Sequence, residues 1–192
     1  FLIHRKENKM DSMVATQIVG GNPTQRRSET DFYPTPPEAT QALLDFLHLF
    51  PKTVVWEPAC GEGDMVEVME KNGLCVVGTD IQTGYDFLQT DIPDEVQWII
   101  TNPPFSLAEE FIRKSAIHNV PFAMLLKSQY WHAAKRISLF STIPPAYVLP
   151  LTWRPDFLFK KHEKRSAPLM DVNWCVWIPG SRRTEYIPLV KP

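Results

Sequence analysis

The stretch Thr53-Val54-Val55-Trp56-Glu57-Pro58-Ala59-Cys60-Gly61-Glu62-Gly63-Asp64 indicates how the chain is organised. Its first five residues are mostly apolar, which predicts a short buried strand. Gly61-Glu62-Gly63 predicts a tight turn, and residues 64–72 predict a helix. A second apolar run at residues 74–79 predicts the next strand. This part of the chain is therefore expected to fold as strand, glycine turn, helix and strand.

Strands and helices are expected to alternate along most of the chain. We predict helices at residues 38–50, 64–72, 106–118 and 131–142, and strands at 53–57, 74–79, 97–101, 121–127, 147–152 and 172–178. Thr35 is expected to cap the first helix, and Ser106 with Glu109 the third. This order predicts an α/β fold with a doubly wound, mostly parallel sheet and an antiparallel β-hairpin at its edge. Residues 1–30 are expected to form a poorly ordered tail, and residues 31–192 a single domain.

The cysteines and histidines argue against a disulfide framework and a metal site. Cys60, Cys75 and Cys175 are an odd number and form no CxxC pair. The five histidines are scattered without metal-ligand spacing, which disfavours a metal centre and a histidine-based nucleophile. No apolar run approaches the roughly 18 residues of a membrane helix, and residues 1–10 lack the pattern of a signal peptide. A reducing, cytoplasmic setting without a membrane or metal partner is the expectation.

Charge is unevenly distributed, although the net charge is only −2. Residues 31–150 hold 7 Lys and Arg against 15 Asp and Glu, whereas residues 151–192 hold 8 against 4, and residues 1–30 hold 5 against 3. Basic ends around an acidic middle are expected where the ends contact phosphate groups. The basic loop near residues 156–168 is therefore a candidate nucleic-acid contact through Lys160, Lys161, Lys164 and Arg165. A solvated loop is the alternative.

A cofactor site is expected at the carboxyl ends of the strands, where such sheets bind ligands. The glycine turn allows close approach of a ligand, and three carboxylates, Glu57, Asp80 and Asp86, fall at this edge. Asp80 is placed to accept the hydroxyls of a ribose, and Asp86 and Phe87 to contact an adenine ring. The turn matches neither GxGxxG nor a P-loop, and its acidic flanks suit a sulfonium and an amino group better than a pyrophosphate. This favours S-adenosylmethionine over NAD, with a turn that binds no ligand as the alternative.

Asn102-Pro103-Pro104-Phe105 follows the strand at 97–101 and therefore lies at the same edge. Two prolines restrict the backbone and remove donors, so the Asn102 side-chain oxygen and the Pro103 carbonyl become two preset acceptors. They can hold the two N–H groups of an exocyclic amine and stabilise the charge that develops when its lone pair attacks. Phe105 can stack on a base, which must be flipped out of a duplex. The pattern predicts amine methylation, with a proline-rich loop capped by Asn102 as the alternative.

These motifs resemble those of amino-methylating DNA methyltransferases. Residues 57–63 are similar to motif I, Asp80 to the acidic residue of motif II, Asp86-Phe87 to motif III and Asn102-Pro103-Pro104-Phe105 to the NPP[FY] motif IV. Asp31-Phe32-Tyr33-Pro34-Thr35-Pro36 resembles motif X, which in this family packs on the methionine part of the cofactor. The order X, I, II, III, IV over residues 31–130 is that of the gamma-type adenine-N6 enzymes. Residues 153–157 and 173–177 resemble small phage and prophage enzymes.

The resemblance implies a Rossmann-like class I methyltransferase that transfers a methyl group from S-adenosylmethionine to the N6 amine of adenine in DNA. It implies a bacterial or phage-infected cell as the setting. The implied catalytic residues are Asn102, Pro103, Pro104 and Phe105. The implied cofactor residues are Phe32, Tyr33, Pro34, Thr35, Glu57, Pro58, Ala59, Cys60, Gly61, Gly63, Asp64, Asp80, Ile81, Asp86, Phe87 and Asn102.

Further nucleic-acid contacts are predicted around this edge. Lys127 and Tyr130 follow a strand there, and Trp153 and Arg154 adjoin the basic loop. No separate target-recognition domain follows the core, so we expect loops or a protein partner to select the target. An RNA base, a protein glutamine or the N4 of cytosine is an alternative acceptor, and a binding module that has lost catalysis is another reading. Carbon methylation is disfavoured because Cys60 is not in a Pro-Cys context.

Overall fold

The computed structural model describes residues 33–160 and 170–192, all within the compact unit Asp31–Pro192. The tail predicted at residues 1–30 lies outside the described residues, as do Phe32, Lys161, Lys164 and Arg165. Most of the predicted basic loop at residues 156–168 is therefore outside them too.

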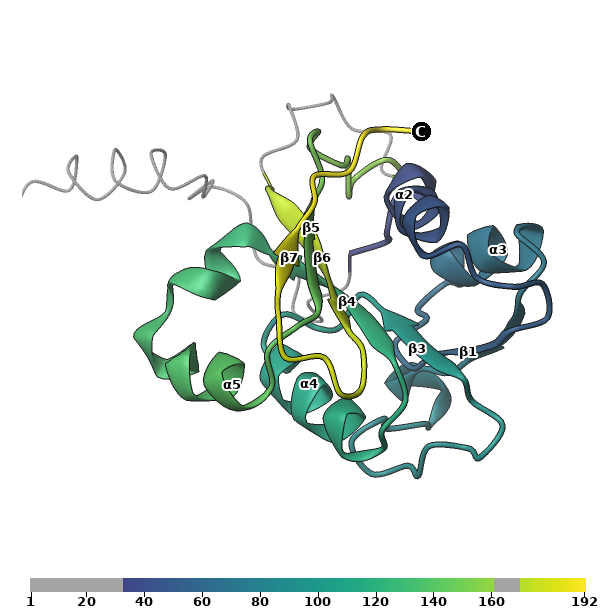
Figure 1. The fold of residues 1–192 in the computed structure, drawn as a ribbon. Helices are drawn as coiled ribbons and strands as arrows, with labels where there is room; N and C mark the ends of the chain where they lie inside the picture. The colour runs from purple at the N-terminus through teal and green to yellow at the C-terminus, as the bar shows by residue number, and fades with distance from the viewer. Residues whose placement is uncertain (1–32, 161–169) are drawn as a thin grey trace, which may run out of the picture. The chain divides into compact units, whose positions relative to one another are not determined.

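The described residues form a seven-stranded mixed sheet (Figure 1). The strand order is β2-β1-β3-β4-β6-β5-β7. β6 runs antiparallel to both its neighbours, β4 and β5, and the other pairs are parallel. The strands are β1 (Val54–Glu57), β2 (Cys75–Gly78), β3 (Trp98–Thr101), β4 (Phe122–Lys127), β5 (Tyr147–Pro150), β6 (Val172–Trp177) and β7 (Glu185–Tyr186). The predicted α/β class with a mostly parallel sheet is confirmed.

The predicted antiparallel pair is β5 with β6, but the outermost position in the sheet belongs to the two-residue strand β7, which pairs with β5. All six residues of β6 are buried. A strand without a polar face needs cover on both sides and neighbours on both flanks, which an interior position provides. Residues 151–171 join these two antiparallel neighbours, so β5 and β6 form a hairpin with a long connection rather than a tight turn.

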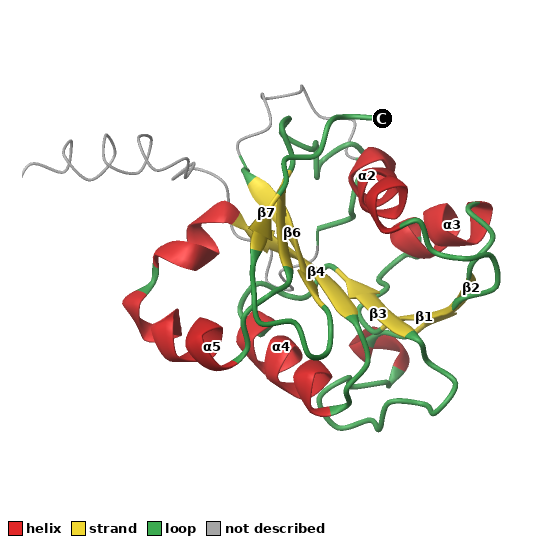
Figure 2. Cartoon of the chain, in the orientation of Figure 1, coloured by secondary structure: helices red, strands yellow, loops and turns green. Residues whose placement is uncertain are grey.

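Helices cover both faces of the sheet (Figure 2). α2 (Pro37–Leu47) and α3 (Asp64–Lys71) pack on one face, and α4 (Ala108–Ile117) and α5 (Ile137–Thr142) on the other. Short 3₁₀ turns are η1 (Ile81–Thr83), η2 (Ser128–His132) and η3 (Ala134–Arg136). The single helix predicted at residues 131–142 is wrong, because the extended backbone of Ala133 (φ −99°, ψ 117°) separates η2 from η3.

Two predicted helix caps also differ from the structure. The cap position of α4 is Leu107, whose N–H bonds the Pro104 carbonyl at 2.9 Å, so a turn precedes the helix and Ser106 lies one residue too early. The cap position of α2 is Pro36, with Pro37 in the first turn. Thr35 therefore does not cap α2, and its hydroxyl is engaged elsewhere.

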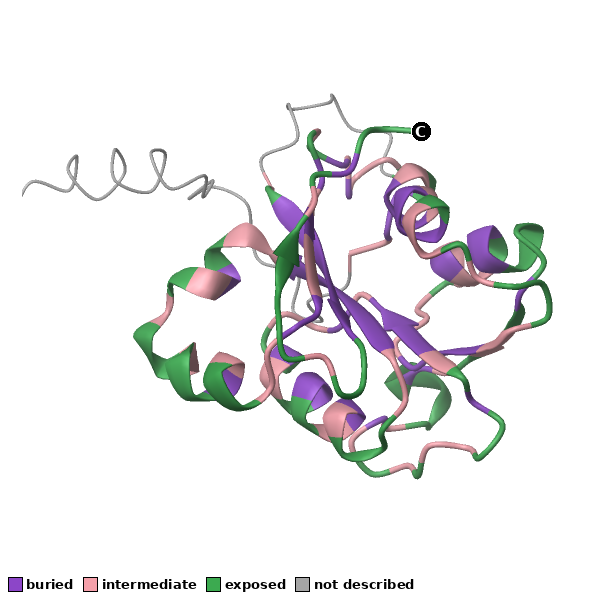
Figure 3. Cartoon of the chain, in the orientation of Figure 1, coloured by how far each residue is buried: buried purple, intermediate pink, exposed green. Residues whose placement is uncertain are grey.

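The core consists of two apolar clusters separated by the sheet. Successive residues of a strand face opposite sides. Accordingly, Val55 joins the cluster under α2 and α3, whereas its neighbour Trp56 joins the one under α4 and α5. In β6, Trp174 and Trp177 divide in the same way and are buried. Figure 3 shows β3, β4 and β6 as the buried centre of the sheet.

Candidate active site

The parallel strands bring the predicted site residues to one edge of the sheet. β2, β1, β3 and β4 are neighbours that run in the same direction, so their carboxyl ends lie together. Glu57 ends β1, and Asp80 follows β2 by two residues. Asn102 follows β3 directly, and Lys127 ends β4. The two halves of the predicted site, from separate parts of the sequence, are therefore adjacent.

The loop between β1 and α3 is a turn that is open on its outer side and is supported by the side chain of Asp80. Gly61 and Gly63 have φ values of 51° and 88°, a region that favours glycine. A Cβ added at Gly63 would meet nothing within 4 Å, so its outer side is open. Asp80 supports the turn, because its carboxylate accepts from the N–H groups of Gly61 at 2.9 Å and Gln82 at 2.8 Å. Asp80 therefore shapes the loop as well as lying where a ribose was expected.

The other predicted cofactor residues differ in exposure. Pro58 is buried, Ala59, Cys60, Asp64 and Asp86 are half-buried, and Ile81 is 65% exposed. Asp86 accepts from the N–H of Leu88 at 2.9 Å. Phe87 is only 2% exposed and packs between Trp56 and Phe111, at centroid distances of 5.2 and 4.5 Å. The Phe87 ring, which was predicted to contact the adenine ring, therefore packs in the core.

Glu57 is a buried carboxyl with one oxygen engaged and one without a partner. Oε1 accepts from the N–H of Ala59 at 3.0 Å and from the hydroxyl of Thr101 at 2.6 Å. Oε2 is buried and has no hydrogen-bond partner among the described residues. Burial raises the pKa of Glu57 from 4.5 to about 8, since a charged carboxylate is poorly solvated there. A cation placed beside Oε2 would favour the charged form again.

Asn102 has its amide nitrogen engaged and its oxygen free to accept. Nδ2 donates to the carbonyl of Tyr33 at 3.3 Å and to the hydroxyl of Thr35 at 2.9 Å. Oδ1 is buried and has no hydrogen-bond partner among residues 33–160 and 170–192. A buried acceptor without a donor is costly, so it marks a place where a ligand donor would fit.

Two threonines join the parts of the site, and sequence patterns assigned neither to this task. Thr101 ends β3 and connects the Asn102 loop to Glu57. Thr35 connects the same loop to the segment before α2. A hydroxyl at the end of the otherwise apolar run Trp98–Thr101 was the only sequence signal for Thr101. Thr35 was predicted as a helix cap and a cofactor contact.

Phe105 packs between an aromatic ring and an ammonium group. The Tyr33 ring lies 5.8 Å from it and 6.4 Å from Phe157, measured between centroids. The Lys127 ammonium lies over the Phe105 ring, 4.1 Å from its centroid, within range of a cation–π interaction. A base that stacks on this face of Phe105 must therefore displace Lys127. Trp153 is half-buried on the α2 side of the core, and its indole N–H has no partner among the described residues.

Tyr130 does not lie on the surface, as a predicted nucleic-acid contact would. It is 6% exposed and belongs to the cluster under α4 and α5. The Arg136 guanidinium lies 3.5 Å from its ring centroid. Burial raises the pKa of its hydroxyl. The 3₁₀ turn η2 directs this side chain inward, so Tyr130 packs in the core rather than on the surface.

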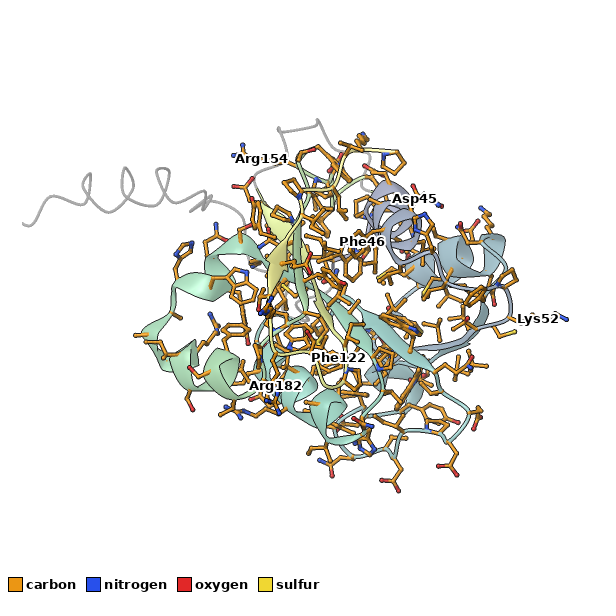
Figure 4. All side chains as sticks on the ribbon, viewed as in Figure 1. Asp45, Phe46, Lys52, Phe122, Arg154 and Arg182 are labelled. Atoms are coloured by element: carbon orange, nitrogen blue, oxygen red, sulfur yellow. The ribbon has the colours of Figure 1, made fainter. Side chains whose placement is uncertain are left out.

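The predicted phosphate contacts that the structure describes are paired with carboxylates. Arg154 bonds Asp171 at 2.7 Å. Lys160 bonds Glu62 at 2.8 Å and Asp64 at 2.6 Å, which raises the pKa of its ammonium and ties residue 160 to the glycine loop. Figure 4 shows Arg154 and Arg182 at opposite ends of the sheet, so Arg182 lies away from the site edge. The described basic residues Arg154 and Lys160 are therefore not unpaired charges on the surface.

Within residues 33–160 and 170–192, no three His, Cys, Asp or Glu side chains are grouped as a metal site would require. Over the same ranges, no helix is long and apolar enough to cross a membrane.

The sequence itself matches no family model and no curated protein. Solved structures do match. A protein from Listeria monocytogenes classed as a class I S-adenosylmethionine-dependent methyltransferase superposes with a TM-score of 0.58 at 13% identity. The match covers 94% of this chain and 72% of that one.

Two further structures extend the comparison to different substrates. The type I restriction-modification methyltransferase subunit from Streptococcus thermophilus matches with a TM-score of 0.57 at 11% identity, over 92% of this chain but only 50% of that one. An S-adenosylmethionine-dependent O-methyltransferase from Thermotoga maritima matches with a TM-score of 0.54 at 11% identity, over 80% of this chain and 69% of that one. The chain thus spans half of the restriction-modification subunit. It has the Rossmann-like α/β fold of class I S-adenosylmethionine-dependent methyltransferases.

Proposed function

We propose that this protein transfers a methyl group from S-adenosylmethionine to the exocyclic N6 of adenine in DNA. The observation that carries the proposal is the buried Asn102 Oδ1, an acceptor without a donor, held at the edge where this fold binds its ligands. An N–H of a substrate amine supplies the missing donor. The Pro103 carbonyl is the second acceptor, since the Pro104 carbonyl already accepts from Leu107.

Two acceptors are what methylation of such an amine requires. The lone pair of an exocyclic amine is delocalised into its ring, so the nitrogen is a weak nucleophile. Acceptors that hold both N–H groups favour a tetrahedral nitrogen and stabilise its developing positive charge. The nitrogen then bonds the methyl carbon as the carbon–sulfur bond breaks with its electron pair going to sulfur, and afterwards it loses a proton to water. No base needs to act before the transfer.

The glycine loop fits S-adenosylmethionine, which when bound supplies a methyl group on positively charged sulfur. Gly63 leaves open space where a side chain would stand. Glu57 Oε2 is a buried acceptor that an ammonium group can satisfy, and such a cation lowers the pKa of this carboxyl towards its usual range. Asp80 and Asp86 are assigned to the ribose and the adenine edge. Glu57 thus binds the cofactor, while Asn102 acts on the methyl acceptor.

A DNA base as the acceptor is supported by the site and by one of the similar structures. Phe105 offers a ring on which a flipped base can stack. The Lys127 ammonium now lies over that ring, and once the base displaces it, it can pair with a phosphate of the nucleotide. The Streptococcus thermophilus protein is a subunit of a restriction-modification system. By analogy with a subunit of such a system, we assign target selection to residues 151–171 or to a partner protein.

Identification of the product tests the proposal. The protein is incubated with methyl-labelled S-adenosylmethionine and, separately, with duplex DNA, RNA and a protein mixture, and the digested products are separated. We expect label in N6-methyladenine from DNA. Label only in N4-methylcytosine, in an RNA base or in methylglutamine would replace the proposed acceptor with that one, while keeping the amine chemistry.

A further inference from the structure

Asn102 can act as proposed only in one of the two orientations of its amide. With Oδ1 towards the acceptor amine, the side chain receives an N–H. After a half-turn, Nδ2 would face that N–H, donor against donor, and Oδ1 would face the carbonyl of Tyr33, acceptor against acceptor. Catalysis therefore depends on whatever fixes this orientation.

Two groups of one short segment face Asn102 Nδ2. The Tyr33 carbonyl is only an acceptor, and it lies at 3.3 Å, beyond the usual range for such a bond. The Thr35 hydroxyl lies at 2.9 Å, the usual length for an N–H···O bond. Thr35 is 4% exposed, so a water molecule cannot readily replace its hydroxyl as the partner of Asn102 Nδ2. The Thr35 hydroxyl can donate as well as accept, so the Tyr33 carbonyl decides which way the amide faces, and the shorter Thr35 bond holds the amide in that orientation.

The segment that carries Thr35 is itself well fixed. Pro34 and Pro36 flank Thr35, and each restricts its own backbone and that of the residue before it. α2 begins at Pro37, and the buried indole of Trp174 donates to the carbonyl of Ala39 in its first turn at 2.8 Å. The hydroxyl of Thr35 is therefore presented to Asn102 from a rigid support.

We propose that Thr35 is a positioning residue: its hydroxyl anchors the Asn102 amide in the orientation that the Tyr33 carbonyl selects, so that Oδ1 faces the methyl acceptor. This rests on the proposed function for the role of Asn102, and it gives Thr35 a task separate from cofactor binding. The segment 33–35 holds both catalytic side chains, because the Tyr33 ring also packs against Phe105.

Substitutions at residue 35 separate orientation from cofactor binding. T35V keeps the shape of the side chain and removes the hydroxyl, and T35S keeps the hydroxyl. We expect T35V to lower kcat by about fivefold to tenfold, as for one lost hydrogen bond, with the Kd for S-adenosylmethionine unchanged within about twofold. T35S should recover most of the turnover. If T35V instead weakens cofactor binding by the same factor at unchanged kcat, the hydroxyl belongs to the cofactor site and the proposal fails.

Two controls exclude a general packing effect. Thr40 is 0% exposed, and its hydroxyl has no hydrogen-bond partner among the described residues, so T40V removes a buried hydroxyl away from Asn102. T40V should keep kcat within about twofold. In the N102A background, T35V should cause no further loss, because the group that it orients is gone. Equal losses in T40V, or an unchanged effect of T35V without Asn102, overturn the proposal.

A measurement without turnover distinguishes failure of this inference from failure of the proposed function. The side-chain amide signals of Asn102 are identified by NMR from their loss in N102A. Their hydrogen exchange should be about fivefold to tenfold faster in T35V than in the wild type and in T40V. If wild-type protein methylates no amine yet this change occurs, only the proposed function falls. Unchanged exchange in T35V overturns the orienting role whatever the substrate.

Discussion

Glu57 and Asn102 share a property at the scale of single residues. Each presents a buried side-chain oxygen without a partner among the described residues. Natural cores rarely leave such atoms unsatisfied. Glu57 ends β1 and Asn102 follows β3, so the two residues lie at the ends of adjacent parallel strands, at the same edge of the sheet. Ligand groups that donate hydrogen bonds to these two oxygens would remove the free-energy cost of leaving them unpaired.

N102A should lower kcat by about 10²- to 10³-fold, the usual loss when a preset partner of a transition state is removed. The Kd for S-adenosylmethionine should stay within about twofold, since the lost oxygen acts on the methyl acceptor. Steady-state kinetics and calorimetry measure the two quantities. N72A, a change at an exposed asparagine after α3, serves as the control. Cofactor binding that disappears together with turnover would contradict the role assigned to Asn102.

Glu57 should make the free protein less stable as pH rises from about 5 to 8. Its pKa is raised from 4.5 to about 8, so the folded state holds a proton that the unfolded chain releases in this range. The contribution of Glu57 to the free energy of unfolding is fully present below pH 4.5 and is lost as the pH rises through about 8. The total loss is at most about 5 kcal/mol.

E57Q removes this titration. The amide oxygen can still accept from Ala59 and Thr101, so the local contacts remain. Urea unfolding at pH 5 and pH 8 measures the effect, and the loss of stability between the two pH values should be smaller in E57Q than in the wild type. Identical losses in both proteins would show that Glu57 does not titrate in this range.

At the scale of elements, β6 connects the centre of the sheet to α2. Trp174 is fully buried in β6, and its indole N–H bonds the α2 backbone at Ala39. W174F should lower the free energy of unfolding by about 1–3 kcal/mol, through the loss of a buried hydrogen bond and a smaller ring. Urea titration measures this change, and C75A on the exposed strand β2 should be nearly neutral. A stability equal to the wild type would mean that α2 does not depend on this bond.

Sequence patterns predicted the elements well where local signals act alone. Strands predicted at residues 97–101 and 121–127 are Trp98–Thr101 and Phe122–Lys127 in the structure, since short apolar runs bounded by polar or turn residues define their own ends. Helix starts were less accurate, because the turn at Pro104 and the extended Ala133 depend on local backbone geometry that composition does not reveal.

Side-chain partners far apart in sequence were beyond prediction. Asn102 and Thr35 are 67 residues apart, and Lys160 and Glu62 are 98 apart. The motifs located the candidate site at the strand ends, but only the folded chain shows that Asn102 donates a hydrogen bond to Thr35. The same holds for Phe87, which follows a polar turn in sequence yet packs in the core.

At the scale of the whole molecule, the pairing of charges matters more than their sum. Lys160 is neutralised by two carboxylates, whereas Lys161, Lys164 and Arg165 lie outside the described residues. We expect the triple variant K161A/K164A/R165A to bind DNA more weakly and to lower the slope of log K against log salt by about 3. K160M should change that slope far less. Binding isotherms at several salt concentrations measure both, and an unchanged slope in the triple variant would make this stretch a solvated loop.

Because β6 runs against β5, the chain leaves the sheet at Pro150 and re-enters it at Val172 on the edge that carries Asn102. Under the proposed function, polypeptide inserted between these two points would change what meets the substrate, while the pairing of β5 with β6 stays intact. Doubling the length of such a connection costs only about 0.6 kcal/mol. Insertions in this connection would thus change the target and leave the chemistry beside β3 as it is.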